Sequence, residues 1–105
     1  MSVPMELDAI VHAIVQAARP VRVILFGSHA KRRAGPESDL DICVIERDGF
    51  GPRRSRRAEI ARIYRALARF PVPKDILVFS EEEVRRGGIP VLDDILEEGT
   101  VLYEQ

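Results

Sequence analysis

The chain has 105 residues, of which 46% are hydrophobic and 31% charged, and its net charge is −1. This length supports one hydrophobic core, so we expect a single domain over residues 1–105. The composition excludes two classes of protein: no apolar run approaches the ~20 residues of a membrane helix, and a single cysteine, Cys43, allows neither an internal disulfide nor a cysteine-based zinc site. Because Glu6 and Asp8 precede the first apolar stretch, unlike in a signal peptide, we expect a cytoplasmic protein without membrane association.

Hydrophobic periodicity divides the chain into alternating helices and strands. Apolar residues at helical spacing predict a first helix within residues 5–20, which Pro20 closes. The following segments are, in chain order, a strand at 21–28, a strand at 38–46, an amphipathic helix at 53–70, a strand at 74–80, a short helix, a helix at 89–99 and a strand at 100–103. Ser80 and Glu83 have capping-box spacing and open the short helix.

The lengths of the connections predict the topology. About nine residues separate the first two strands, too few for a parallel crossover, so these strands are expected to be antiparallel neighbours. A whole helix separates the second strand from the third, which permits a right-handed parallel crossover. The expected fold is α/β, a small mixed β-sheet packed with helices, with the second strand at its centre.

Aspartate is depleted in strands, yet two aspartates begin the second strand. Side chains alternate along a strand, so Asp39 and Asp41 lie on one face. Antiparallel pairing places them beside Gly27 and Ser28 at the end of the first strand, and a parallel third strand brings Asp75 to the same end. Because Mg²⁺ prefers hard oxygen ligands, the three carboxylates predict a magnesium site.

The turn after the first strand supplies the other half of the predicted site. Gly27 permits a close backbone approach, and the amides of a short helical turn beginning at Ser28 suit an anion such as phosphate. Ser28 adds a hydroxyl donor and Lys31 adds positive charge. Carboxylates with metal on one side and a phosphate cradle on the other predict a nucleoside triphosphate site, although neither motif is specific alone.

Together the segments "GSHAKRRAGPESDLDICV" and "KDILVF" resemble the DNA polymerase beta nucleotidyltransferase superfamily, and in particular the minimal nucleotidyltransferases. The resemblance spans residues 21–103 and implies the polymerase-beta-type fold. These relatives tend to read Gly-Ser-x-Ala-Arg-Gly after the first strand, whereas this chain has Lys31 and Arg32 in the last two positions.

The resemblance also implies a reaction. Asp39 and Asp41 would hold two Mg²⁺ ions, Asp75 would complete the second ion's site, and Gly27, Ser28 and Lys31 would bind the nucleotide. The nucleotide would be ATP or another nucleoside triphosphate, and the transferred group would be AMP. The acceptor would be a tyrosine hydroxyl of a HEPN-type helical toxin, so that the chain acts as an antitoxin in a hetero-oligomer.

Alternatives to this function, and to the roles of two of the aspartates, remain open at this point. Asp39 alone reads as a turn residue, and Asp75 alone as the ion-pair partner of Lys74 or an arginine. The same fold could also mask a helical partner with weak or no catalysis. A nucleic-acid binder using the arginine-rich stretch 53–69 is disfavoured by the acidic end of the sheet and by missing aromatic platforms.

The charge is distributed unevenly along the chain. Residues 31–69 carry eleven basic and six acidic residues, whereas residues 70–105 carry three basic and nine acidic residues. This complementary charge would assist docking of a protein partner.

Overall fold

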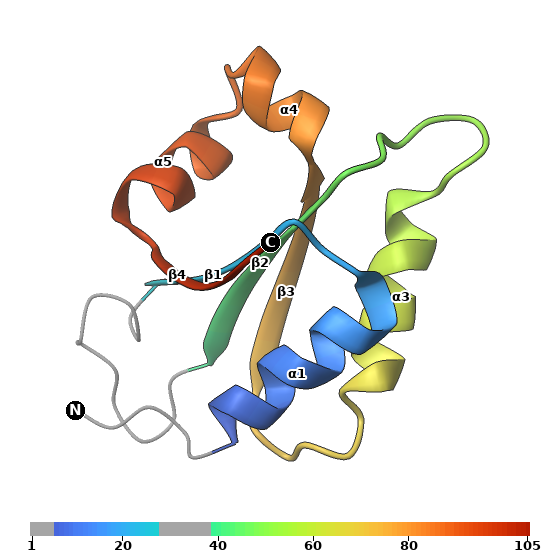
Figure 1. Cartoon of the computed structure of the whole chain (residues 1–105), viewed down its shortest axis with the longest axis vertical. Helices are drawn as coiled ribbons and strands as arrows, with labels where there is room; N and C mark the ends of the chain where they lie inside the picture. Colours follow the sequence, from blue (N-terminus) through green and yellow to red (C-terminus); the bar gives the residue numbers. More distant parts are fainter. Residues whose placement is uncertain (1–5, 28–38) are drawn as a thin grey trace.

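The computed structural model describes residues 6–27 and 39–105. These residues form one four-stranded sheet with helices on both faces (Figure 1). The elements are, in chain order, α1 (Leu7–Ala18), β1 (Arg22–Phe26), β2 (Leu40–Glu46), α3 (Arg56–Ala66), β3 (Lys74–Ser80), α4 (Glu81–Arg86), α5 (Pro90–Glu98) and β4 (Thr100–Glu104). Within the described part of the chain, no helix is both long and apolar enough to cross a membrane.

The order of the strands in the sheet is β3-β2-β1-β4. β1 pairs antiparallel with β2, and β2 pairs parallel with β3 across the α3 crossover, so both predicted pairings are confirmed. β4 returns antiparallel to β1 with a register shift between Val23 and Ile24. β2 therefore has a neighbour on each side, which explains why every residue from Ile42 to Glu46 is buried.

The two faces of the sheet carry two separate apolar layers. The alternation of side chains sends Leu40, Ile42 and Val44 of β2 toward α1 and α3, where they join Ile10, Ile14 and Ile63. The intervening Cys43 and Ile45 face α4 and α5 and pack with Leu92 and Ile95. Figure 1 shows the two helix pairs on opposite sides of the sheet. Cys43 is fully buried in this second layer, where it packs as a small hydrophobic residue.

The starts of α3 and β2 differ from the boundaries that periodicity predicts. α3 begins at Arg56 rather than at Arg53, because Ser55 caps it: the Ser55 hydroxyl accepts a hydrogen bond from the Ala58 N–H at 3.1 Å. Asp39 precedes β2 instead of lying within it. The predicted capping box of α4 is confirmed, since Ser80 and Glu83 exchange hydrogen bonds between side chain and backbone.

Side chains of α3 cover the outer edge of β3. Tyr64 follows Ile60 and Ile63 at helical spacing, but it is 36% exposed, and its hydroxyl accepts a hydrogen bond from the Ile76 N–H at 3.0 Å. Two residues further along β3, Arg56 Nη1 donates to the Val78 carbonyl at 2.7 Å. These contacts satisfy backbone groups that an edge strand otherwise presents to another chain. The α3 helix thus protects the edge as well as filling the core.

Candidate active site

Two of the predicted catalytic aspartates lie side by side at one end of the sheet. Asp41 of β2 pairs in register with Asp75 of the parallel strand β3. On its other side Asp41 pairs with Phe26, the last residue of β1, and Gly27 follows directly. Neighbouring strands are separated by about 4.8 Å, so Asp41 and Asp75 are close enough for their side chains to contact the same ligand.

Both aspartates lie on the face covered by α4 and α5. Along β2 this face continues as Cys43 and Ile45, and along β3 it continues as Leu77 and Phe79. The face is therefore apolar over most of its length and acidic at the beginning of β2 and β3. Asp39 and Asp75 are exposed, whereas Asp41 is half-buried. This exposure leaves the acidic end open to a ligand from solvent.

Gly27 lies directly against the Asp41 carboxylate. A β-carbon at Gly27 would lie 2.1 Å from Oδ2 of Asp41 and 3.0 Å from its Cγ. The backbone of Gly27 also has a φ of +72°, which other residues rarely adopt. Two independent constraints therefore require glycine where the first strand turns toward the predicted nucleotide-binding segment.

The hydrogen bonds that the described residues form at the start of β3 involve Lys74 and do not involve the side chain of Asp75. Lys74 Nζ donates to the Phe70 and Val72 carbonyls at 2.9 and 2.8 Å, so its charge is directed to the turn before β3. Among residues 6–27 and 39–105, no ion pair involves Asp75. Pairing of Asp75 with Lys74 is therefore wrong, and no arginine among the described residues forms an ion pair with Asp75.

Comparison with known proteins decides the family. The sequence matches the family model of the nucleotidyltransferase domain over residues 7–103. This chain belongs to the nucleotidyltransferase domain family. It is a nucleotidyltransferase, and the resemblance inferred from the Gly-Ser and Asp-x-Asp segments is confirmed.

Solved structures share the fold of this nucleotidyltransferase. One is a toxin–antitoxin with AMP-PNP, 20% identical, with a TM-score of 0.61 over 93% of this chain and 73% of that one. A second is a putative nucleotidyltransferase from Sulfolobus solfataricus, 19% identical, with a TM-score of 0.63 over 94% and 78%. A third is a tri-AMPylated Shewanella oneidensis HEPN toxin in complex with MNT antitoxin, 19% identical, with a TM-score of 0.53 over 93% and 69%. These likenesses confirm the polymerase-beta-type fold. Comparison with curated proteins finds no match.

The structure brings together part of the predicted site. Gly27, Asp41 and Asp75 meet at one end of the sheet, and Asp39 lies two residues before Asp41. Ser28 and Lys31 fall outside the described residues. As the described side chains are placed, no group of three or more His, Cys, Asp or Glu is gathered closely enough to hold a metal ion. The metal-ligand set of the nucleotidyltransferase therefore stays a prediction.

Sequence reasoning missed a second acidic pair in this nucleotidyltransferase. Glu46 ends β2 and Glu59 lies in the first turn of α3, and both are buried, at 2% and 8% exposure. The available signal was the position of Glu46, which continues the buried alternation of Leu40, Ile42 and Val44.

Proposed function

We propose that this nucleotidyltransferase uses magnesium to transfer AMP from ATP to a tyrosine hydroxyl of a HEPN-type toxin, and so acts as an antitoxin. The observation that carries the proposal is the register of Asp41 with Asp75, with Gly27 packed against the Asp41 carboxylate. This arrangement supports the proposal because it brings two carboxylates and Gly27 to one end of the sheet, where a metal-bound triphosphate would need both metal ligands and a close backbone approach.

The donor chemistry of this end fits a divalent hard cation. The side chains of Asp39, Asp41 and Asp75 supply carboxylate oxygens, the ligand class that Mg²⁺ takes in proteins. Gly27 contributes by having no side chain, because any β-carbon there would push the Asp41 carboxylate from its place. When bound, magnesium would neutralise charge on the departing pyrophosphate and lower the pKa of the acceptor hydroxyl.

The residues of the chain have separate tasks in this proposal. Asp39 and Asp41 would hold the metal that carries the triphosphate. Asp75 would complete the ligand set of the magnesium that lowers the pKa of the acceptor hydroxyl. Gly27, Ser28 and Lys31 would contact the phosphates, Gly27 through its open backbone and Lys31 through its charge.

The proposed partner rests on the fold neighbours. One of these structures is a toxin–antitoxin with AMP-PNP, and another holds a tri-AMPylated HEPN toxin with MNT antitoxin. On this chain the exposed cations available for docking are fewer than the sequence suggests, because Arg54, Arg56 and Arg62 form internal ion pairs. The exposed arginines of the stretch that form no ion pair with described residues are Arg53, Arg57, Arg65 and Arg69.

Co-expression with the protein encoded beside it, followed by intact-mass spectrometry, tests the proposed function. The wild type should add mass to the partner in AMP increments, and Asp39→Asn should add none. A stable complex in which the partner stays unmodified, and in which Asp39→Asn still neutralises toxicity, would instead establish the masking antitoxin. If no partner binds and no ATP is consumed, both forms of the antitoxin proposal are wrong.

A further inference from the structure

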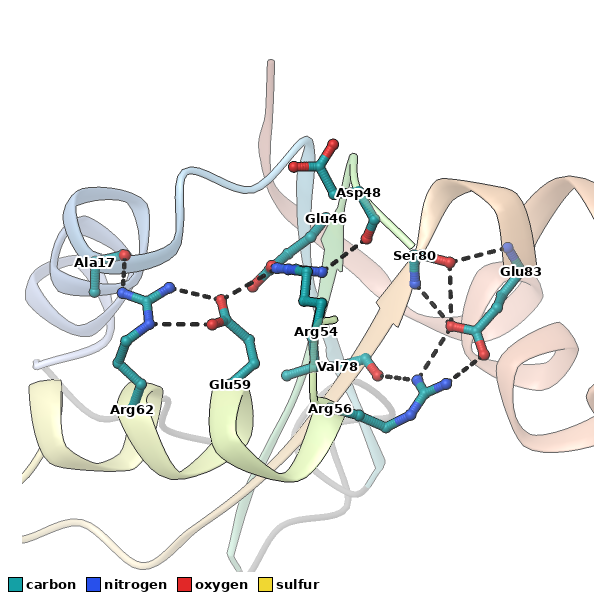
Figure 2. Close-up of polar contacts among 10 residues, drawn as sticks. All are labelled: Ala17, Glu46, Asp48, Arg54, Arg56, Glu59, Arg62, Val78, Ser80 and Glu83. Carbon is teal, nitrogen blue, oxygen red and sulfur yellow. Dashed lines mark hydrogen bonds and ion pairs between the residues drawn. The ribbon is translucent and has the colours of Figure 1, made fainter. Parts of the chain in front are cut away.

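Glu46 and Glu59 form a buried acidic pair at the end of the sheet opposite Asp41. Glu46 is the last residue of β2 and Glu59 lies on the inner side of α3, so the pair joins the sheet to a helix. Figure 2 shows Glu59 extending from α3 toward the place where Glu46 and Arg54 meet. Acidic residues are almost never fully buried without partners, so the negative charge of this pair must be compensated.

Two arginines, Arg54 and Arg62, compensate part of this negative charge. Arg54 Nη2 donates to Oε1 of Glu46 and lies 3.6 Å from Oε2 of Glu59. Arg62 donates two hydrogen bonds to Glu59, from Nε to Oε1 at 3.0 Å and from Nη2 to Oε2 at 2.7 Å. Arg62 also donates to the Ala17 carbonyl, which ties the cluster to the end of α1 (Figure 2). Glu59 therefore has two cations, whereas Glu46 has one.

One oxygen of the pair has no donor. Oε2 of Glu46 is buried and accepts no hydrogen bond from the described residues. An ionised Glu46 would leave a charged oxygen without solvent or donor, which is costly in a protein interior. A protonated Glu46 removes that cost, because its hydroxyl can donate to the Glu59 carboxylate while Oε1 still accepts from Arg54. The unpartnered oxygen therefore favours a proton shared between the two carboxyls.

We propose that Glu46 and Glu59 share one proton, and that this acid–carboxylate pair is a pH-sensitive latch between β2 and α3. The proton resides on Glu46, and Glu59 stays ionised between its two arginines. When the proton leaves, two carboxylates face each other with Arg54 shared between them. The contact that holds the start of α3 on the sheet then weakens.

The expected titration agrees with this assignment. Burial, together with the hydrogen bond to Glu59, raises the pKa of Glu46 to about 7 against the opposing effect of Arg54. For Glu59, burial acts to raise the pKa, but the hydrogen bonds with Glu46 and Arg62 outweigh it and hold the pKa below its ordinary value. The other charged groups nearby line an open surface hollow of about 350 Å³ beside Glu46; they are Arg19, Arg47 and Asp48.

The sign of the pH effect follows from these directions. Glu46 has a higher pKa in the folded chain than in the unfolded chain. Its contribution to stability is therefore complete below its ordinary pKa of 4.5 and is lost as pH rises to about 7. The latch should be closed in mildly acidic solution and weakened above neutral pH.

Carboxyl-carbon NMR of the wild-type chain tests the latch directly. The Glu46 side-chain signal should titrate with a midpoint near 7, far above that of an exposed glutamate, and a midpoint below 5 would overturn the proposal. In Glu59→Gln the midpoint should move down, because the anionic acceptor of the proton is gone. An unchanged midpoint in that variant would show that Glu59 does not share the proton.

Thermal unfolding between pH 5 and pH 8.5 supplies the second measurement. Glu46→Gln mimics the protonated acid, so it should match the wild type at pH 5 and melt several degrees higher at pH 8.5. Glu83→Gln is the control: Glu83 is another paired, largely buried carboxylate, at 15% side-chain exposure, but its pKa is lowered. That variant should keep the wild-type fall in Tm across this range. If Glu46→Gln and the wild type fall in parallel, the pair is no latch.

Discussion

The Asp41 carboxylate occupies the space that a side chain at residue 27 would fill. Asp41 lies in β2 and Gly27 directly follows the antiparallel neighbour β1, and a β-carbon on Gly27 would come within 2.1 Å of Oδ2 of Asp41. The position of a proposed metal ligand thus depends on the absence of a side chain on the neighbouring strand. This contact links the Gly-Ser and Asp-x-Asp segments, as their expected antiparallel pairing predicts.

Gly27→Ala should disable the site. The positive φ alone costs about 1–2 kcal/mol for a residue with a β-carbon, and the clash must in addition displace Asp41. We expect a lower Tm and loss of AMP transfer. Gly88→Ala is the matched control, because Gly88 also has a positive φ, of +81°, but a β-carbon there meets nothing within 4 Å. A Gly88→Ala protein that loses transfer as completely would show that the loss reflects backbone strain rather than the contact with Asp41.

Asp75→Asn should abolish transfer while the fold survives. Asp75 is exposed and has no ion-pair partner among the described residues, so removing its charge leaves no buried group unpaired. If Asp75 is a metal ligand, labelled AMP transfer should fall by about 100-fold or more, with Tm within a few degrees of the wild type. Asp94→Asn on the exposed side of α5 is the control and should keep full activity. Retained transfer in Asp75→Asn would remove Asp75 from the site.

Magnesium with ATP should stabilise the folded chain. A ligand that binds only the folded state raises stability by about 2.7 kcal/mol at roughly 100 times its Kd, which corresponds to a rise in Tm of about 10 °C for a domain of this size. The double variant Asp39→Asn/Asp41→Asn should lose most of that rise. Thermal shift with ATP and EDTA, compared with ATP and MgCl₂, separates the metal's contribution from that of the nucleotide. Equal rises in both proteins would rule out these two aspartates as the ligands.

Tyr64→Phe should destabilise the chain without affecting transfer chemistry. The Tyr64 hydroxyl accepts from the Ile76 N–H at 3.0 Å, and its removal leaves a backbone donor at the β3 edge without that partner. We expect a loss of about 1 kcal/mol in the free energy of unfolding, measured by urea denaturation. Tyr103→Phe is the matched control, because the Tyr103 hydroxyl has no partner among the described residues. A smaller loss in Tyr64→Phe than in Tyr103→Phe would mean that the edge contact contributes little.

The local sequence was sufficient for the elements themselves. The β-branched runs predict the strands because such residues suit a pleated, half-buried surface. Ser80 and Glu83 predict the start of α4 because a capping box needs only residues three apart. The connection lengths predict the strand directions, since a short connection cannot cross over. The acidic end of the sheet follows from these directions, which is why Asp41 and Asp75 could be expected together before their register was known.

Tertiary packing determined the burial, the hydrogen-bond partners and the charge state of individual side chains. Tyr64 fits the apolar stripe of α3 by spacing, but the edge position of β3 turns its hydroxyl into a cap for the Ile76 N–H. Glu46 and Glu59 look like ordinary surface charges thirteen residues apart, and only the packing of α3 over the end of β2 buries them together. A local pattern specifies periodicity, whereas the charge state of a carboxyl depends on the solvent and the partners that remain around it once distant segments have packed.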